Sequence, residues 1–228
     1  MSKVNKFFDE LFDLIPGYIF GLLYFFIGLI GDIIALLLSP DYIMWKKSIS
    51  ILGHHPGGIF LRVGLIISSI FSILFIVYMG RVLKQESVNN NLRKLAVITG
   101  IFSSAAAIFT GTFSGFNEFI SSLHGLGALL SWIGGAIFCI LFSIVMLQST
   151  NFSKKAAYAG FIVAGIFLTF LIPFFITNFC NLYVDICYSF GRRVYLILPT
   201  YEWVVIFSIL FWHLFYSSYI VYKKIKLD

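Results

Sequence analysis

The stretch from Gly17 to Leu38 reads GYIFGLLYFFIGLIGDIIALLL, and it decides the fold class. An α-helix rises about 1.5 Å per residue, so crossing a hydrocarbon core of roughly 30 Å takes about 20 apolar residues. This stretch has that length, and Asp32 is its only charged residue. Five more stretches are comparably long and apolar, at Gly57–Met79, Leu95–Phe113, Leu123–Leu147, Ala156–Thr177 and Thr200–Tyr222. The sequence therefore predicts six transmembrane helices.

The composition supports this interpretation. Hydrophobic residues make up 60% of the 228-residue chain and charged residues 11%. Soluble domains are about 45–50% apolar, and about a quarter of their residues are charged. The apolar surplus must therefore face lipid. The short alternating segments of a β-barrel are missing, so we expect an all-α integral membrane bundle that forms one compact domain.

Basic residues predict the orientation, because they collect in the cytoplasmic loops of membrane proteins. The N-terminus, the second and fourth connections and the C-terminus hold eleven of the sixteen: Lys3, Lys6, Arg81, Lys84, Arg93, Lys94, Lys154, Lys155, Lys223, Lys224 and Lys226. The opposite side holds Lys46, Lys47, Arg62, Arg192 and Arg193. We expect both termini in the cytoplasm of a multi-pass cell-membrane protein. The net charge of +6 is explained in this way, with membrane lipids and not nucleic acid as partners.

Residues 1–16 have the pattern of an amphipathic helix lying on the inner membrane surface. One predicted face carries Phe7, Phe8, Leu11, Phe12 and Ile15, and the other carries Lys6, Asp9, Glu10 and Asp13. A cleaved signal peptide is not favoured, because the following apolar run is too long. We therefore expect an interfacial segment at 1–16, a six-helix domain at 17–222 and a basic cytoplasmic tail at 223–228.

Two charges lie several residues inside the predicted spans. A charge in hydrocarbon costs roughly 2.5–3.5 kcal/mol on insertion scales, so it indicates protein interior or a wet cavity. Asp32 and Arg62 lie at similar depths below the outer boundary, in consecutive spans. We expect them to form an ion pair, which either joins two helices or faces a ligand.

Further polar residues lie near the same boundary. Glu118 and His124 flank the start of the fourth span, Glu202 begins the sixth, and His54 precedes the second. The inner halves of the spans are nearly free of ionisable groups, so we expect an outward-facing polar pocket. His213 lies deeper, and there a hydrogen bond to a neighbouring main-chain or hydroxyl group is favoured over a role as a ligand.

Histidine and cysteine usage leaves two questions open. No regular metal-binding spacing occurs, yet His54 or His55 with His124, Glu118 and Glu202 could hold one metal, so the cofactor is undetermined. Cys139 is expected to pack as a small apolar residue. Cys180 and Cys187 lie seven residues apart on the predicted outer side. The sequence is consistent both with a disulfide between them and with two free thiols.

Several short motifs occur together in a characteristic order. They are SISILG at 48–53, Gly111-Thr-Phe, Leu123-His124, Arg192 or Arg193, and PTYEW at 199–203. This order resembles the six-helix membrane-protein family catalogued as domain of unknown function 998, over residues 20 to 222. The resemblance implies a six-helix fold and no particular activity.

The resemblance also directs attention to particular residues. Ser48, Ser50, His124 and Glu202 match motif positions, all on the predicted outer side. The family often has a proline after the Gly-x-Phe element, where this chain has Ser114. That departure affects the shape of one turn and not the architecture.

Three functions are consistent with the sequence. The first is the binding or carrying of a lipid-like or amphipathic small molecule, with candidate ligand-binding residues Asp32, Arg62, Ser48, Ser50, Glu118, His124, Arg193 and Glu202. The second is an intramembrane lipid-processing enzyme, with or without a bound metal, with His124 and Glu202 as its acid–base residues. The third is a structural scaffold without a site. The sequence leaves the oligomeric state undetermined.

Overall fold

The computed structural model describes residues 3–85, 87–113, 117–182 and 184–223, and these contain helices and no strand. Six helices are long and apolar enough to cross a membrane, as predicted: α2 (Tyr18–Leu37), α4 (Gly58–Val82), α5 (Asn90–Thr112), α6 (Glu118–Gln148), α7 (Lys154–Leu182) and α9 (Leu198–Lys223). The shorter elements are α1 (Lys3–Leu14), α3 (Ile49–Leu52), the 3-10 turn η1 (Leu83–Gln85) and α8 (Val184–Tyr195). Ser114 and residues 224–228 of the predicted tail lie outside the described residues.

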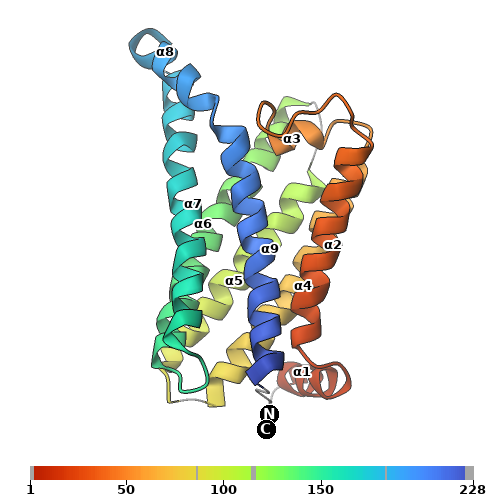
Figure 1. Ribbon diagram of the computed structural model, residues 1–228, viewed down its shortest axis with the longest axis vertical. Helices are drawn as coiled ribbons and strands as arrows, with labels where there is room; N and C mark the ends of the chain where they lie inside the picture. The colour runs from red at the N-terminus through yellow and green to blue at the C-terminus, as the bar shows by residue number, and fades with distance from the viewer. Residues whose placement is uncertain (1–2, 86, 114–116, 183, 224–228) are drawn as a thin grey trace.

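The six spanning helices form a closed ring in chain order. Each packs against the next, from α2 through α4, α5, α6 and α7 to α9, and α9 packs back against α2. The helices alternate in direction, and both ends of the described chain lie at the same end of the bundle (Figure 1). We call this the terminal end, and the opposite end, where α3 lies, the α3 end. Which end faces the cytoplasm stays a prediction.

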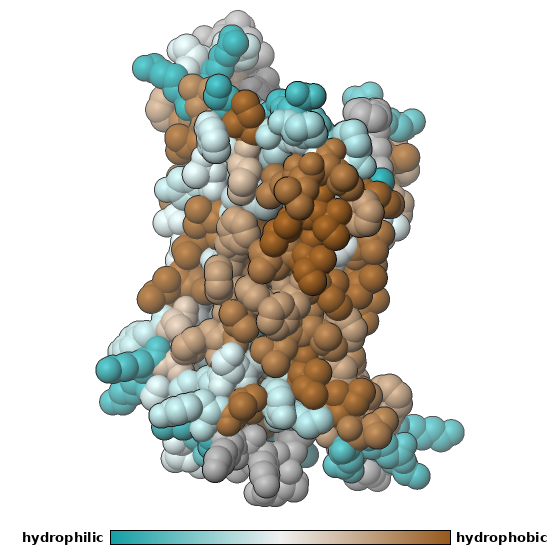
Figure 2. Space-filling model, turned by 45° about the vertical axis from the view of Figure 1, so that its right-hand side comes forward, coloured by the Kyte–Doolittle hydropathy of each residue, from teal (hydrophilic) through white to brown (hydrophobic). Residues whose placement is uncertain are grey.

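The outside of the ring is apolar. Figure 2 shows a hydrophobic band between hydrophilic ends. On α2, the exposed side chains Phe26, Ile30, Ile33 and Leu37 recur at helical spacing. Such a stripe would be unstable in water and is suited to lipid, so the surface agrees with the six-span assignment.

Small residues allow the helices to approach closely. Gly31 of α2 faces Gly64 of α4, and a Cβ added to Gly31 would lie 3.0 Å from the Gly64 Cα. Gly134 of α6 is similarly close to Ser103 of α5. Gly125 and Gly165 differ, because no atom lies within 4 Å of a Cβ added at either position. Small residues at helix contacts are typical of membrane bundles.

The terminal end of the ring is filled by a dense apolar core. Phe75, Phe142 and Tyr216 are fully buried there, and the Tyr216 hydroxyl donates to the main-chain oxygen of Ala156 at 2.7 Å. Cys139 belongs to the same core as a free, fully buried thiol, so its predicted packing role is confirmed.

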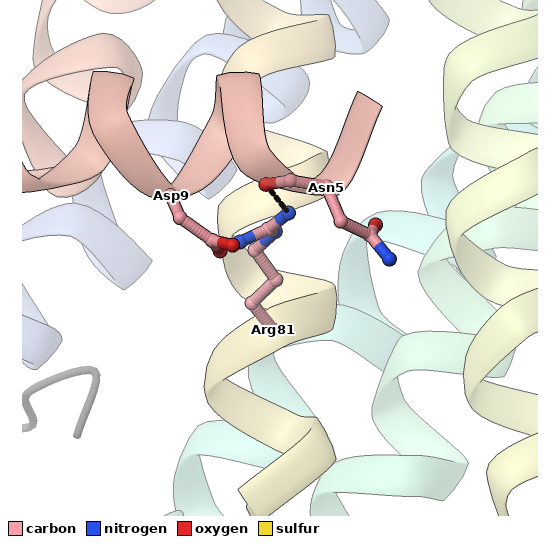
Figure 3. Close-up of polar contacts among 3 residues, drawn as sticks. All are labelled: Asn5, Asp9 and Arg81. Carbon is pink, nitrogen blue, oxygen red and sulfur yellow. Dashed lines mark hydrogen bonds and ion pairs between the residues drawn. The ribbon is translucent and has the colours of Figure 1, made fainter. Parts of the chain in front are cut away.

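Helix α1 lies across the terminal end of the bundle (Figure 1). Phe12 is buried against the bundle, whereas Phe7, predicted for the same face, is 57% exposed. Arg81 of α4 forms an ion pair with Asp9 and donates to the main-chain oxygen of Asn5 (Figure 3). Asp9, predicted for the polar face of this helix, therefore contacts α4. The predicted contact of α1 with the membrane surface stays a prediction.

The structure answers whether Cys180 and Cys187 form a disulfide, which the sequence left open. Cys180 near the end of α7 and Cys187 in α8 form a disulfide bond. The bond fixes α8 to α7 where the chain projects beyond the ring at the α3 end (Figure 1). Disulfides persist in oxidising compartments, so this bond agrees with an extracytoplasmic α3 end.

Gly31→Leu should destabilise the protein, because the new side chain must push α2 and α4 apart. Overpacking of this kind costs about 1–3 kcal/mol. The matched control is Gly165→Leu, where the added side chain meets open space. Thermal unfolding of both variants in the same detergent tests this, and equal midpoints would contradict the close contact.

The predicted orientation can be tested with fusions to alkaline phosphatase, which is active only outside the cytoplasm. We expect activity from a fusion after Asp41, at the α3 end, and none from a fusion after Asn151, at the terminal end. The physical reason is the excess of Lys and Arg in the connections on the terminal side. The reverse pattern would place both termini outside.

Candidate functional site

The ring encloses a cavity of about 280 Å³, which extends inward from the α3 end. All six spanning helices and α3 contribute to its lining. On α9 the lining includes Glu202, Ile206, Ile209 and His213. Eleven residues are just over three helical turns, so Glu202 and His213 lie on one face, about 16 Å apart along the helix. The cavity therefore follows one side of α9 from its mouth to its floor.

Helix α3 and its flanking loop form a cap over the mouth. The Ile49 amide donates to Glu202 Oε2 at 2.7 Å, which satisfies a main-chain donor at the start of α3. Trp203 Nε1 donates to the Tyr42 hydroxyl at 3.1 Å, and that hydroxyl donates to the Lys47 main-chain oxygen at 2.8 Å. Two consecutive residues of α9 thus hold the cap in place.

The buried Tyr42 hydroxyl stays protonated in this cap. Burial raises the pKa of Tyr42 to about 12, and the hydrogen bond from Trp203 opposes this increase. A neutral hydroxyl can donate and accept at once, as its two contacts require. The link between loop and helix is therefore insensitive to pH in the physiological range.

Basic side chains gather at the mouth. Arg62 and His124 line the cavity, and His124 Nδ1 lies 3.0 Å from the main-chain oxygen of Thr110, to which it donates. Burial, followed by electrostatic repulsion from the neighbouring His124 and Arg62 side chains, lowers the pKa of His54 below its usual 6.5. His54 is therefore neutral at pH 7. The mouth has the character of an anion site, with a guanidinium that suits phosphate or carboxylate.

Asp32 of α2 lines the cavity, on the same face of the helix as Tyr24 and Gly28. Its side chain is only 7% exposed. The ion pairs between described residues are Lys6–Glu10 and Arg81–Asp9, so the expected Asp32–Arg62 pair is wrong. In the described part of the chain no group donates a hydrogen bond to the Asp32 carboxyl either. A buried carboxyl thus faces the cavity without a protein partner.

Hydroxyl groups cover the adjoining walls, and sequence reasoning predicted only Ser50 among them. The serines that line the cavity are Ser50, Ser68, Ser69, Ser72, Ser103, Ser104 and Ser131. Ser103 Oγ donates to the Ser131 main-chain oxygen at 2.8 Å, which joins α5 to α6. The available signal was the spacing of Ser68, Ser69 and Ser72, which share one face of an otherwise apolar helix.

His213 forms the floor of the cavity together with Ser72. Its Nδ1 lies 2.9 Å from the Ile209 main-chain oxygen, and its Nε2 lies 2.9 Å from Ser72 Oγ. The predicted main-chain or hydroxyl partner of His213 is therefore confirmed. His213 is about 22 Å from the first residue of α9, beyond the middle of a 30 Å hydrocarbon core. The polar interior extends deeper than the outer half to which the sequence assigned it.

The structure brings together five of the eight predicted ligand-binding residues. They are Asp32, Arg62, Ser50, His124 and Glu202, which all line the cavity. Ser48 contacts Ser50 through a 2.9 Å hydrogen bond and is not part of the lining. Glu118 is exposed at the first residue of α6, and Arg193 is exposed on α8.

The residues considered for a metal site are not gathered at one point. Among the described residues, no three His, Cys, Asp or Glu side chains lie close enough together to hold a metal ion. Glu202 accepts a hydrogen bond from Ile49, and His124 donates to Thr110. What the cavity offers is two carboxyls (Asp32 and Glu202), several hydroxyls and a basic mouth between apolar walls.

The comparisons with known proteins identify a family and nothing narrower. No curated protein and no solved structure matches the chain. One family matches residues 21–219, which reach from α2 into α9 and include most or all of every spanning helix and the whole cavity lining. The resemblance seen in the motifs is confirmed, and the chain belongs to the family described as protein of unknown function (DUF998).

Proposed function

We propose that this membrane protein binds or carries a small amphipathic, lipid-like molecule in the cavity of its helix ring. The observation that carries the proposal is the Asp32 carboxyl, which is 7% exposed and faces the cavity without a protein donor in the described chain. Burying such a group without a hydrogen bond costs free energy. A ligand hydroxyl or amine that donates to Asp32 would offset this cost.

The size and lining of the cavity support a ligand of modest size. Drug-sized ligands occupy pockets of about 300–1,000 Å³, and the volume here is about 280 Å³. Leu61, Leu65, Trp132 and Phe138 supply apolar wall. The space suits a short hydrocarbon segment with a polar group, not a whole two-chain lipid.

The basic mouth supports an acidic group on the ligand. Arg62 and His124 line the cavity near the α3 end, where a lipid head group would lie at the membrane boundary. A guanidinium forms paired hydrogen bonds with phosphate or carboxylate. The ligand class is therefore an anionic amphipathic molecule that also carries hydroxyl or amine donors.

Gly125→Leu should weaken binding of a fluorescent short-chain lysophosphatidylglycerol by about tenfold or more. Gly125 lines the cavity, and a side chain placed there enters unoccupied space. Gly165→Leu is the matched control, because Gly165 also has open space but is not part of the lining. Fluorescence titration of the purified proteins measures both. Equal affinity in both variants would contradict binding in this cavity.

Asp32→Asn should weaken binding of the same probe by about tenfold, because a hydrogen bond to a charged acceptor contributes about 1.5–3 kcal/mol. The control is Asp41→Asn, an exposed position in the loop after α2. Unfolding midpoints of both variants exclude a loss of fold. If neither variant changes the affinity and no lipid accompanies the purified protein, the scaffold interpretation is favoured.

A further inference from the structure

At the cavity floor a serine and a histidine from different helices form a direct hydrogen bond. Ser72 Oγ of α4 lies 2.9 Å from His213 Nε2 of α9. Ser104 Oγ of α5 lies 2.9 Å from Ser72 Oγ, and His213 Nδ1 lies 2.9 Å from the Ile209 main-chain oxygen. Four groups from three helices thus form one hydrogen-bonded chain.

The partners determine which atom donates at each step. A main-chain carbonyl oxygen only accepts, so His213 Nδ1 carries the proton and donates to Ile209. Nε2 then has a lone pair, which accepts the Ser72 hydroxyl proton. Because Ser72 has one proton, Ser104 must donate in the remaining contact. Ser72 is therefore a hydroxyl already bonded to a base.

Aromatic neighbours hold the imidazole in this orientation. The Tyr24 ring is stacked on His213 with centroids 3.7 Å apart, and the rings of Trp212 and Phe75 lie at 4.9 Å and 5.5 Å. His213 is 1% exposed. A ring enclosed on these sides keeps Nε2 directed at Ser72, which is the arrangement of an oriented general base.

The same groups are reachable from the cavity. Ser72, Ser104 and His213 belong to its lining, together with the apolar side chains of Phe138 and Leu210. A molecule whose hydrocarbon part lies between those apolar groups brings its adjoining polar bond next to Ser72 Oγ. A carbonyl next to an alkyl chain is the electrophile that fits a base-activated serine.

We propose that Ser72 is a nucleophile activated by His213, and that the cavity accepts acyl esters whose acyl group Ser72 transfers to water. The proposal rests on the binding of amphipathic molecules in this cavity and adds a chemical step at its floor. It uses neither His124 nor Glu202, whose contacts lie at the mouth.

The step balances in protons and bonds. Ser72 Oγ adds to the ester carbonyl carbon while its proton passes to His213 Nε2. The bond from the carbonyl carbon to the alcohol oxygen then breaks, and the alcohol leaves with the proton from His213. Water, deprotonated by Nε2, adds to the acyl-serine, and the acid leaves as Ser72 regains its proton. The Ile209 carbonyl holds Nδ1 and orients the ring throughout.

Octyl fluorophosphonate tests the nucleophile directly, because an activated serine forms an Oγ–P bond and displaces fluoride. We expect the purified full-length protein to gain one adduct, which peptide mass spectrometry locates at Ser72. Ser72→Ala should abolish the adduct, and His213→Gln should slow its formation by about 100-fold or more. Ser208→Ala, at a serine of α9 that is not part of the cavity lining and bonds to the Val205 main-chain oxygen, should react like the unaltered protein.

A non-reactive analogue separates this proposal from the binding function. Octyl methylphosphonate should displace the fluorescent lysophosphatidylglycerol from the unaltered protein and from Ser72→Ala alike. Displacement without any Ser72 adduct would overturn the nucleophile and leave the binding function standing. An adduct that persists in Ser72→Ala would also overturn it. Absence of probe binding by the unaltered protein would overturn the binding function itself.

Discussion

Polar side chains cannot be left facing hydrocarbon, and this constraint sets the rotation of each helix in the ring. Ser72, Ser104 and His213 can satisfy one another only if α4, α5 and α9 turn these faces to a common interior. Hydrogen bonds between membrane helices contribute on average only about 0.6 kcal/mol each. Their main effect here is on specificity, because a rotated helix would expose hydroxyls to lipid and lose its partners.

Helix α9 closes the ring, and it also connects the two ends of the cavity. At the mouth, Glu202 and Trp203 hold the cap through Ile49 and Tyr42. At the floor, His213 contacts Ser72. These anchors lie on one continuous helix, so a movement of α9 toward or away from α2 would change the cap and the floor together. The closing contact of the ring is therefore also the contact on which the site depends.

The spans and the family were predictable because they depend on length, average hydropathy and motif order. The rotation of each helix about its own axis was not predictable, because many rotations are compatible with the same hydropathy. The Asp32–Arg62 pair was expected from depth alone, and similar depth does not bring two side chains together. The buried side chain of His213 was interpreted correctly because an imidazole in an apolar helix needs a partner.

The serines show a different limit of sequence reasoning. A serine in a membrane helix can satisfy its hydroxyl on its own main chain, as Ser68 does with Leu65. Its presence therefore does not reveal whether it faces a cavity. Ser72 differs from Ser68 only in what α5 and α9 place beside it, and that depends on the closed ring. For the same reason, a spacing of seven residues left the disulfide undecided until α8 was seen to fold back on α7.

The difference between the two ends of the ring favours binding of a ligand over its passage across the membrane. The α3 end has a cavity beneath a short cap, whereas the terminal end is filled by Phe75, Phe142 and Tyr216, all fully buried. Opening a path there would separate close-packed aromatic rings and break the Tyr216–Ala156 hydrogen bond. At that end Arg81 of α4 also holds helix α1 through its ion pair with Asp9 (Figure 3). A molecule that enters from the α3 side thus meets the Ser72–His213 floor and then a dense core, so it must leave, altered or unaltered, by the side from which it came.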